Sequence, residues 1–240
     1  MTALMHCIGV DLGWVSGASG LALLSAEEGG PRFVDAGRIS DLDEVVAWID
    51  ARAGDDCVVA VDAPLRLGNV SGMRAAEKQA HRLYGRRDAG CYPAHANSVF
   101  AARTTGFSRT LAERGFVLSH EPSRTGRRQF ECFPHIVSVE MFGLERILKY
   151  KKGPRAARGA ALCELRELIA SRLGILDLVL PVVPERGDLK DAEDRLDAVL
   201  CAYAAYWWWR WGYERNRVLG DPEEGCMIVP VAAAISERRG

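Results

Sequence analysis

Two aspartates stand at the ends of short apolar runs. Asp11 follows the run Cys7–Val10, and Asp62 follows the run Cys57–Val61. Continuous apolar runs are typical of strands that are buried on both faces, and Asp is disfavoured inside a strand. Each Asp is therefore either a turn residue or a site residue. If the two strands are parallel neighbours, their ends meet at one edge of the sheet, which is where open α/β sheets bind ligands.

Further carboxylates that could share such a site lie later in the chain. Asp194 and Asp197 are three residues apart in a segment expected to be helical, so both point to one face. Glu131 lies in a third apolar run, Gln129–Phe133. Clustered carboxylates raise one another's pKa unless positive charge lies between them, and two Mg²⁺ or Mn²⁺ ions about 3.5–4 Å apart supply that charge in phosphodiester-cleaving enzymes. The alternative is that the strand-end acids are turn residues and the helix pair is a solvated surface, and spacing alone favours neither.

The elements that must position these acids follow a clear order. Asp11 ends the first strand, and short links lead to strands near 21–24 and 33–39, which indicates an antiparallel meander. A capped helix over about 41–52 then precedes the strand that ends at Asp62. The predicted order is therefore strand, strand, strand, helix, strand.

The second half of the chain completes the layout. The sequence predicts a fifth strand, three helices and, after Gly220, a closing loop with a short extended piece, over 129–133, 134–142, 156–173, 191–211 and 227–229. The Arg-rich segment from about 72 to 118 is interpreted as a helical insertion beside the carboxylate edge. Together these elements predict an α/β fold with a ribonuclease H-like layout. It has a mixed five-stranded sheet and flanking helices, in one domain that spans residues 1–240.

The composition limits the classes of function. The formal net charge is −1, whereas a protein that only binds long nucleic acid is more often strongly basic. The seven cysteines show no CxxC spacing, which is typical of reduced thiols in a cytosolic protein. No signal peptide is recognised, and no apolar run approaches the roughly 20 residues that a membrane span needs. We therefore expect a cytoplasmic protein without membrane contact.

Six short motifs occur in an order that resembles a known family. The chain is similar in these motifs, over nearly its whole length, to the DUF429 family, described as predicted nucleases with a ribonuclease H-like fold. The motifs are Ile8-Gly9-Val10-Asp11, Val61-Asp62-Ala63-Pro64-Leu65, Phe130-Glu131-Cys132-Phe133-Pro134-His135, Leu148-Lys149-Tyr150-Lys151-Lys152-Gly153, Asp194-Arg195-Leu196-Asp197-Ala198 and Gly220-Asp221-Pro222-Glu223-Glu224-Gly225. Each motif alone is weakly specific, and the six in order are specific to the family rather than to an activity.

The resemblance implies a set of metal ligands and a substrate. Asp11 would be the first-strand ligand, Asp62 the fourth-strand acid, and Asp197 with Asp194 the acids of the last helix. Glu131 matches the family's Glu-x-x-Pro position and is the weaker candidate. The implied cofactor is Mg²⁺ or Mn²⁺, and the implied substrate is DNA or RNA. The chain departs from the ribonuclease H layout because the acids of its first helix look solvated; these are Asp43, Glu44 and Asp50.

Two other candidates could assist catalysis. His135 follows Pro134 near Glu131 and could shuttle a proton, although a helix-start histidine with no catalytic role fits equally well. Lys152 belongs to a basic patch with Lys151 that could neutralise a phosphate, and Arg155 and Arg158 follow it. A solvated basic loop is the alternative for this patch.

The aromatic residues have a structural and a binding interpretation. The last helix carries four tryptophans that one helical face cannot bury, so a homodimer contact through this helix is one prediction; they are Trp207, Trp208, Trp209 and Trp211. Tyr84 and Tyr92, with nearby arginines, could stack a base, whereas core packing of the tyrosines is the commoner outcome.

Three classes of function remain. The leading hypothesis is a metal-dependent nuclease that hydrolyses phosphodiesters. The second is a non-catalytic ribonuclease H-like module that binds nucleic acid or a protein partner. An actin-like phosphotransferase shares the strand and helix order, but such enzymes need a duplicated half and a second Gly-rich phosphate loop, neither of which the sequence contains.

Overall fold

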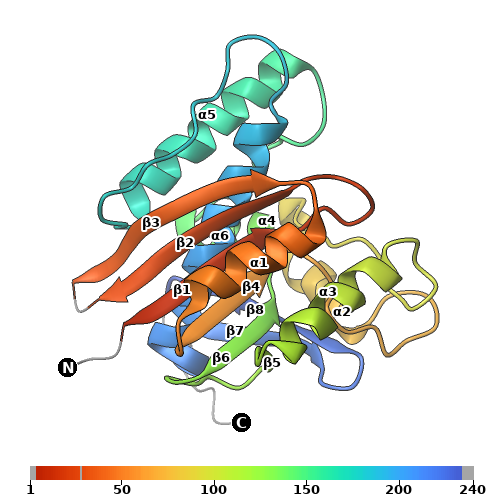
Figure 1. The fold of residues 1–240 in the computed structure, drawn as a ribbon. Helices are drawn as coiled ribbons and strands as arrows, with labels where there is room; N and C mark the ends of the chain where they lie inside the picture. The colour runs from red at the N-terminus through yellow and green to blue at the C-terminus, as the bar shows by residue number, and fades with distance from the viewer. Residues whose placement is uncertain (1–3, 28, 234–240) are drawn as a thin grey trace.

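The computed structural model describes residues 4–27 and 29–233, and its centre is a mixed sheet of eight strands (Figure 1). The strands are β1 (Met5–Asp11), β2 (Ser19–Glu27), β3 (Gly30–Ile39), β4 (Cys57–Val61), β5 (Val117–Leu118), β6 (Arg127–Glu131), β7 (Asn216–Asp221) and β8 (Gly225–Pro230). The α-helices are α1 (Leu42–Ala53), α2 (Ala75–Tyr84), α3 (Ala101–Glu113), α4 (Pro134–Phe142), α5 (Arg155–Arg172) and α6 (Lys190–Trp211).

The strand order places β1 and β4 side by side. The order is β3-β2-β1-β4-β6-β8-β7, and β5 pairs with β6 off this path. The first three strands form the predicted antiparallel meander, whereas β4 runs parallel to β1, and β6 runs parallel to β4. The carboxyl ends of β1, β4 and β6 therefore lie at one edge of the sheet, as the sequence predicts for Asp11 and Asp62.

Alternate residues of the central strands pack on opposite faces of the sheet. Cys7 and Ala60 pack in the core beneath α4, α5 and α6, whereas Ile8 and Val59 pack in the core beneath α1 and α3. In Figure 1, α1 lies in front of the sheet and α6 behind it. Because side chains in a strand alternate with a period of two, the position of each strand-end acid in this alternation determines which helices it faces.

Two glycines let α6 lie directly on the sheet. A Cβ atom on Gly9 would lie 2.0 Å from the carbonyl oxygen of Ala198, and a Cβ atom on Gly20 would lie 2.0 Å from that of Asp194. No side chain fits between backbones at these distances, so only glycine is compatible with this packing. The contact holds the first half of α6, with Asp194 and Asp197, beside the ends of β1 and β4.

The sheet is larger than the predicted five strands. The predicted extended piece at 227–229 lies within β8, which forms an antiparallel hairpin with β7 and pairs through Met227 with Glu131 of β6. The sequence does not predict β7, because this strand has only two apolar residues and no alternating pattern. In the turn between β7 and β8, the Glu224 carboxylate accepts a hydrogen bond from the Ala75 N–H at the start of α2 (2.9 Å).

The segment from 72 to 118 connects β4 to β6 and is largely helical, as predicted. It contains α2, a 3₁₀ turn at Gly85–Arg87 and α3. Its last two residues form β5, which pairs with β6 and ties the segment to the sheet. Whether it is an insertion into a single domain stays a prediction.

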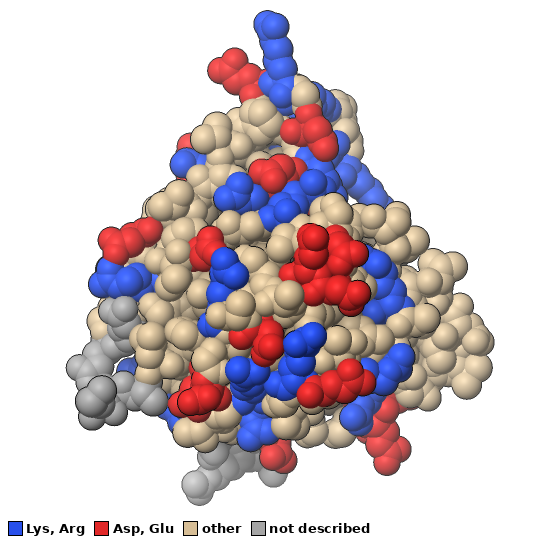
Figure 2. Space-filling view, viewed as in Figure 1, with Lys and Arg blue, Asp and Glu red and all other residues tan. Residues whose placement is uncertain are grey.

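The surface shows no dominant charge. Basic and acidic side chains are interspersed on the face seen in Figure 2, in keeping with a net charge of −1. Across residues 4–27 and 29–233, every helix is too short or too polar to cross a membrane.

Candidate active site

Asp11 and Asp62 lie side by side at the carboxyl edge of the sheet. Val10 pairs with Val61 in parallel register, and the Asp62 N–H donates to the Val10 carbonyl (2.8 Å). Asp11 follows Cys7 and Gly9 in the alternation of β1, and Asp62 follows Ala60 in that of β4, so both side chains face α6. Both residues are buried. The strand register thus fixes the first two carboxylates of the site.

Asp197 reaches the same place from α6 and is completely buried. Its Oδ1 accepts a hydrogen bond from the Tyr150 hydroxyl at 2.6 Å. Its Oδ2 lies 2.8 Å from the Lys151 ammonium and makes no hydrogen bond of regular geometry. The same ammonium lies 3.9 Å from Asp62 Oδ2. Lys151 therefore stands between two of the carboxylates.

The site has an excess of negative charge, and its pKa values respond to it. Burial raises the pKa of Asp11 well above its usual range; Lys151 opposes this shift, and Asp197 and Asp62 add to it. Burial raises the pKa of Asp62 to about 6. Burial alone would lower the pKa of Lys151, but the charges of Asp197 and Asp11 outweigh burial and raise it. Lys151 is thus a permanent cation at neutral pH.

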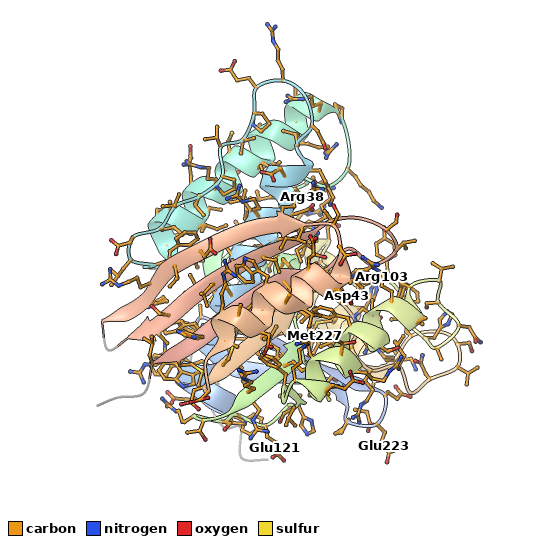
Figure 3. The ribbon with its side chains drawn as sticks, in the orientation of Figure 1. Arg38, Asp43, Arg103, Glu121, Glu223 and Met227 are labelled. Carbon is orange, nitrogen blue, oxygen red and sulfur yellow. The ribbon has the colours of Figure 1, made fainter. Side chains whose placement is uncertain are left out.

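Asp194 lies one helical turn before Asp197 but has its own partners. The Arg38 guanidinium is 2.8 Å from its Oδ2, and the Lys190 ammonium is 2.7 Å from its Oδ1. Figure 3 shows Arg38 on the sheet end toward which β1 runs. Both oxygens of this predicted metal ligand are therefore already paired with cations.

Glu131 does not join the other carboxylates. The preceding residue, Phe130, packs edge-on against Trp208 of α6, so Glu131 points to the opposite face of the sheet. There its Oε1 accepts hydrogen bonds from the backbone N–H groups of Leu65 (2.7 Å) and Arg66 (3.1 Å). The buried Arg74 guanidinium also donates to both Glu131 oxygens, at 2.9 Å each. A residue one position later in the strand would have faced α6.

The two predicted catalytic assistants lie near the site in different settings. His135 is buried beside the Tyr150 ring, at 5.1 Å between ring centroids, and burial lowers its pKa to about 4. It is therefore neutral at pH 7 and a weak base, and its Nδ1 has no hydrogen-bond partner. Lys152 lies on the exposed rim, where its ammonium bonds the hydroxyl of the exposed Tyr92.

The basic patch divides into two parts. Lys151 and Lys152 face the site and its rim, whereas Arg155 and Arg158 bind backbone carbonyls of their own chain, at Gly187 and Tyr150. The arginines therefore hold the loops that surround the site and are less available to a substrate.

The aromatic candidates also divide. Tyr84 is buried, with its hydroxyl bonded to Arg217 (2.9 Å), so it belongs to the core, whereas Tyr92 lies on the rim. The Trp cluster of α6 is covered in part by its own chain: Arg215 lies 4.2 Å from the Trp211 ring centroid. The homodimer contact stays a prediction.

A cavity of about 780 Å³ lies over the carboxylates. This is within the range of roughly 300–1,000 Å³ that small-molecule sites occupy. Asp11 and Asp62 line it, and Trp14, Tyr92 and Lys152 are among its other walls. Glu131 also lines this cavity, together with its partners Arg74 and Glu77, although its hydrogen bonds are separate from those of the aspartates. The Trp14 indole N–H donates to the Asp62 carbonyl (2.8 Å), which ties this wall to the end of β4. Acidic, basic and aromatic groups thus share one pocket.

The sequence gives no individual role to three residues that shape the site. Lys151 is predicted only as one member of a basic patch, and Tyr150 and Lys190 are not singled out. Lys190 has a readable signal, since it lies four residues before Asp194 and directly precedes the helix predicted over 191–211. The position of Lys151 depends on how its loop packs, and no local pattern specifies that.

The donor set suits a hard divalent cation in its chemistry. Carboxylate oxygens are the ligands that Mg²⁺ and Mn²⁺ prefer, and Asp197 Oδ2 is a buried oxygen without a regular hydrogen bond. Within residues 4–27 and 29–233, no group of three or more His, Cys, Asp or Glu side chains is arranged so that it could hold a metal ion. The residues fit the ion by the chemistry of their oxygens, and in the present arrangement the Lys151 ammonium lies between two of the candidate ligands.

Comparisons with known proteins give a family and a distant likeness to a solved structure. The family model described as "Protein of unknown function (DUF429)" matches residues 9–224. Among solved structures, the chain is similar to one titled "Thermus thermophilus RuvC structure", at 13% sequence identity and a TM-score of 0.35. That likeness covers 85% of this chain and 95% of the other, and a score of this size supports no conclusion about function. No curated protein matches.

Proposed function

This chain belongs to the DUF429 family, and we propose that it is a divalent-metal-dependent phosphodiesterase with a ribonuclease H-like fold that acts on nucleic acid. One observation carries the proposal. Asp11, Asp62 and Asp197 come from three separate elements and converge on one cation at the carboxyl edge of the sheet. Burial without enough positive charge disfavours each ionised acid, so such a cluster lowers the stability of the fold. A cluster with this cost is a candidate functional site.

The topology supports the fold part of the proposal. An antiparallel meander precedes a helix and a parallel strand, and a late acidic helix crosses the sheet beside the strand ends. This is the arrangement predicted for a ribonuclease H-like layout. The hairpin of β7 and β8 extends it on one side.

The reaction is hydrolysis of a phosphodiester bond. A water oxygen bonds to phosphorus, one ester P–O bond breaks, and the departing oxygen takes up a proton. Asp11, Asp62 and Asp197 would hold the metal, which when bound supplies a Lewis acid for the phosphoryl oxygen and lowers the pKa of its water. Lys152, on the rim, would bind a neighbouring phosphate, and Tyr150 orients Asp197 through its hydroxyl.

The remaining predicted site residues have positioning roles in this proposal. Asp194 holds the start of α6 against β3 through Arg38. Glu131 holds the backbone after Asp62 through the N–H groups of Leu65 and Arg66. Neither needs to contact the metal to influence catalysis.

A non-catalytic binding module remains the second candidate, because Lys151 already neutralises part of the cluster. It would bind nucleic acid in the same cavity and leave phosphodiester bonds intact. Cleavage assays separate the two functions.

The test measures cleavage of single-stranded, duplex and DNA–RNA hybrid oligonucleotides in Mg²⁺, Mn²⁺ and EDTA. We expect wild-type cleavage that stops in EDTA and falls more than about 100-fold in Asp11→Asn and Asp197→Asn. That loss exceeds the one seen when outer partners of metal ligands are changed. Asp43→Asn is the matched control, because Asp43 is an exposed acid of α1 (Figure 3) and should keep full activity. Binding without cleavage would favour the second candidate.

A further inference from the structure

We propose that the Lys151 ammonium permanently occupies one of the two cation positions of this site, so that the chain binds one divalent cation where a two-metal nuclease binds two. The inference rests on the proposed function, since it concerns the metal of the same site. In this proposal the Lys151 ammonium takes the place of the second metal ion.

The geometry places the ammonium where a bridging cation would lie. Lys151 Nζ is 2.8 Å from Asp197 Oδ2 and 3.9 Å from Asp62 Oδ2, so it contacts acids of two separate elements. Paired metal ions in phosphodiester-cleaving sites lie only about 3.5–4 Å apart and share such acids. An ammonium at one position therefore excludes an ion there.

The loop that carries Lys151 is anchored on both sides of this residue. Tyr150 is fully buried, and its hydroxyl donates to the other oxygen of Asp197. The Arg158 guanidinium donates to the Tyr150 carbonyl at 2.9 Å, and the side chain of Lys152 bonds Tyr92. The backbone at Lys151 is thus held in place, and the ammonium reaches the acids from a fixed base.

The charges of the site also indicate that it binds one divalent cation. Asp194 is already neutralised by Arg38 and Lys190, which leaves Asp11, Asp62 and Asp197. One divalent cation and one ammonium together balance three carboxylates. A second divalent cation beside Lys151 would give the site a surplus of positive charge before any substrate phosphate enters.

The inference is tested by counting bound Mn²⁺ ions, with isothermal titration calorimetry and with electron paramagnetic resonance of free Mn²⁺. We expect one ion per chain for the wild type and two for Lys151→Met, which removes the charge and keeps most of the length of the side chain. Spin coupling between two close Mn²⁺ ions in the variant would show that the second ion occupies the vacated position.

Two matched variants control for charge and folding. Lys152→Met removes a neighbouring charge that contacts no carboxylate of the site, so it should bind one ion like the wild type. Lys151→Arg keeps the positive charge and should also bind one ion. Thermal unfolding of each variant checks that it is folded before titration.

The other outcomes overturn the inference in distinguishable ways. Two ions in the wild type, or one ion in a folded Lys151→Met, would refute the role of Lys151 and leave metal-dependent hydrolysis intact. If no variant binds Mn²⁺ and the wild type cleaves nothing, the proposed function fails, and the inference fails with it. Wild-type cleavage that needs Mn²⁺, together with one bound ion in the wild type and two in Lys151→Met, supports both.

Discussion

Two groups of buried carboxylates lie at the same edge of the sheet and face opposite sides of it. In the first group, Glu131 and Glu77 share Arg74, and all three side chains are buried. Arg74 donates to both oxygens of Glu131, and its side chain and backbone donate to Glu77. Burial lowers the pKa of Arg74, but the charges of Glu131 and Glu77 outweigh it and raise that pKa.

The second group contains three carboxylates, one more than the first group, and has fewer hydrogen-bond and ion-pair partners. The Lys151 ammonium contacts Asp62 and Asp197, the Tyr150 hydroxyl donates to Asp197 alone, and Asp11 feels the charge of Lys151 without an ion-pair contact to it. Buried charges with complete hydrogen bonding hold a structure together, whereas an incomplete set stays ready for a ligand. The difference supports the proposal that the aspartates hold the metal and that Glu131 has a positioning role, although the sequence presents all of them as acids at strand ends or on a helix.

The largest expected effect comes from the satisfied group. Arg74→Met leaves two buried carboxylates without their cation, so we expect the free energy of unfolding to fall by about 3–5 kcal/mol. Urea denaturation followed by circular dichroism measures it. Arg66→Met is the control, because the Arg66 side chain is exposed and only its backbone binds Glu131. It should change stability by less than about 0.5 kcal/mol. Equal effects of the two substitutions would remove the contrast between the groups.

The aspartate group should respond with the opposite sign. Burial raises the pKa of Asp62 from 3.8 to about 6, so the folded state binds its proton more tightly than the unfolded state does. Proton binding by Asp62 therefore stabilises the folded state at low pH, and this stabilisation is lost as pH rises from about 4 through about 6. In EDTA, Asp62→Asn should stabilise the protein at pH 8 by up to about 3 kcal/mol, and by less at pH 5. Urea denaturation at both pH values measures the difference, and a destabilised variant at pH 8 would show that Asp62 is as well satisfied as Glu131.

A smaller loss should follow from removing the tyrosine hydroxyl that donates to Asp197. Tyr150→Phe deletes the buried hydroxyl that donates to Asp197, and hydrogen bonds to charged groups contribute about 1.5–3 kcal/mol. We expect a loss of about 2 kcal/mol in unfolding free energy. Tyr213→Phe removes an exposed hydroxyl bonded to the His120 carbonyl and should cost less than about 0.5 kcal/mol. Similar losses in the two variants would mean that burial adds nothing to the Asp197 bond.

The smallest effect concerns the turn that supports the Arg74 group. Glu224→Ala removes the acceptor of the Ala75 N–H at the start of α2, and loss of a helix cap costs about 0.5–2 kcal/mol. We expect a value near 0.5–1 kcal/mol by thermal unfolding. Glu223→Ala, at an exposed position of the same turn (Figure 3), should leave the midpoint unchanged. If Glu223→Ala is the more harmful change, the assigned cap is wrong.

Much of the fold could be predicted because local patterns specify it. The apolar runs before Asp11 and Asp62 indicate buried strands, and Pro134 marks the first residue of α4. The hairpin of β7 and β8 was missed because its stability comes from pairing with β6 and packing on α2, which no short pattern encodes.

The site was predictable to the extent that strand register determines it. Asp11 and Asp62 follow from two matching strand ends, and alternation within β6 already contained the information that Glu131 faces away. Counting positions from Phe130 would have separated it from the aspartates. Lys151 is different, because its place among the acids depends on a loop that packs through the buried Tyr150.

The direct contact of α6 with β1 at Gly9 has a consequence for how the protein tolerates change. Because the two backbones are in direct contact there, the spacing of Asp197 and Asp11 does not depend on the size of the neighbouring core side chains. The hydrophobic interior can drift in volume during evolution, or be redesigned for greater thermal stability, while the acids keep their separation. The interior beneath α5 is less free to vary, because Tyr150, whose hydroxyl donates to Asp197, is buried in that same core.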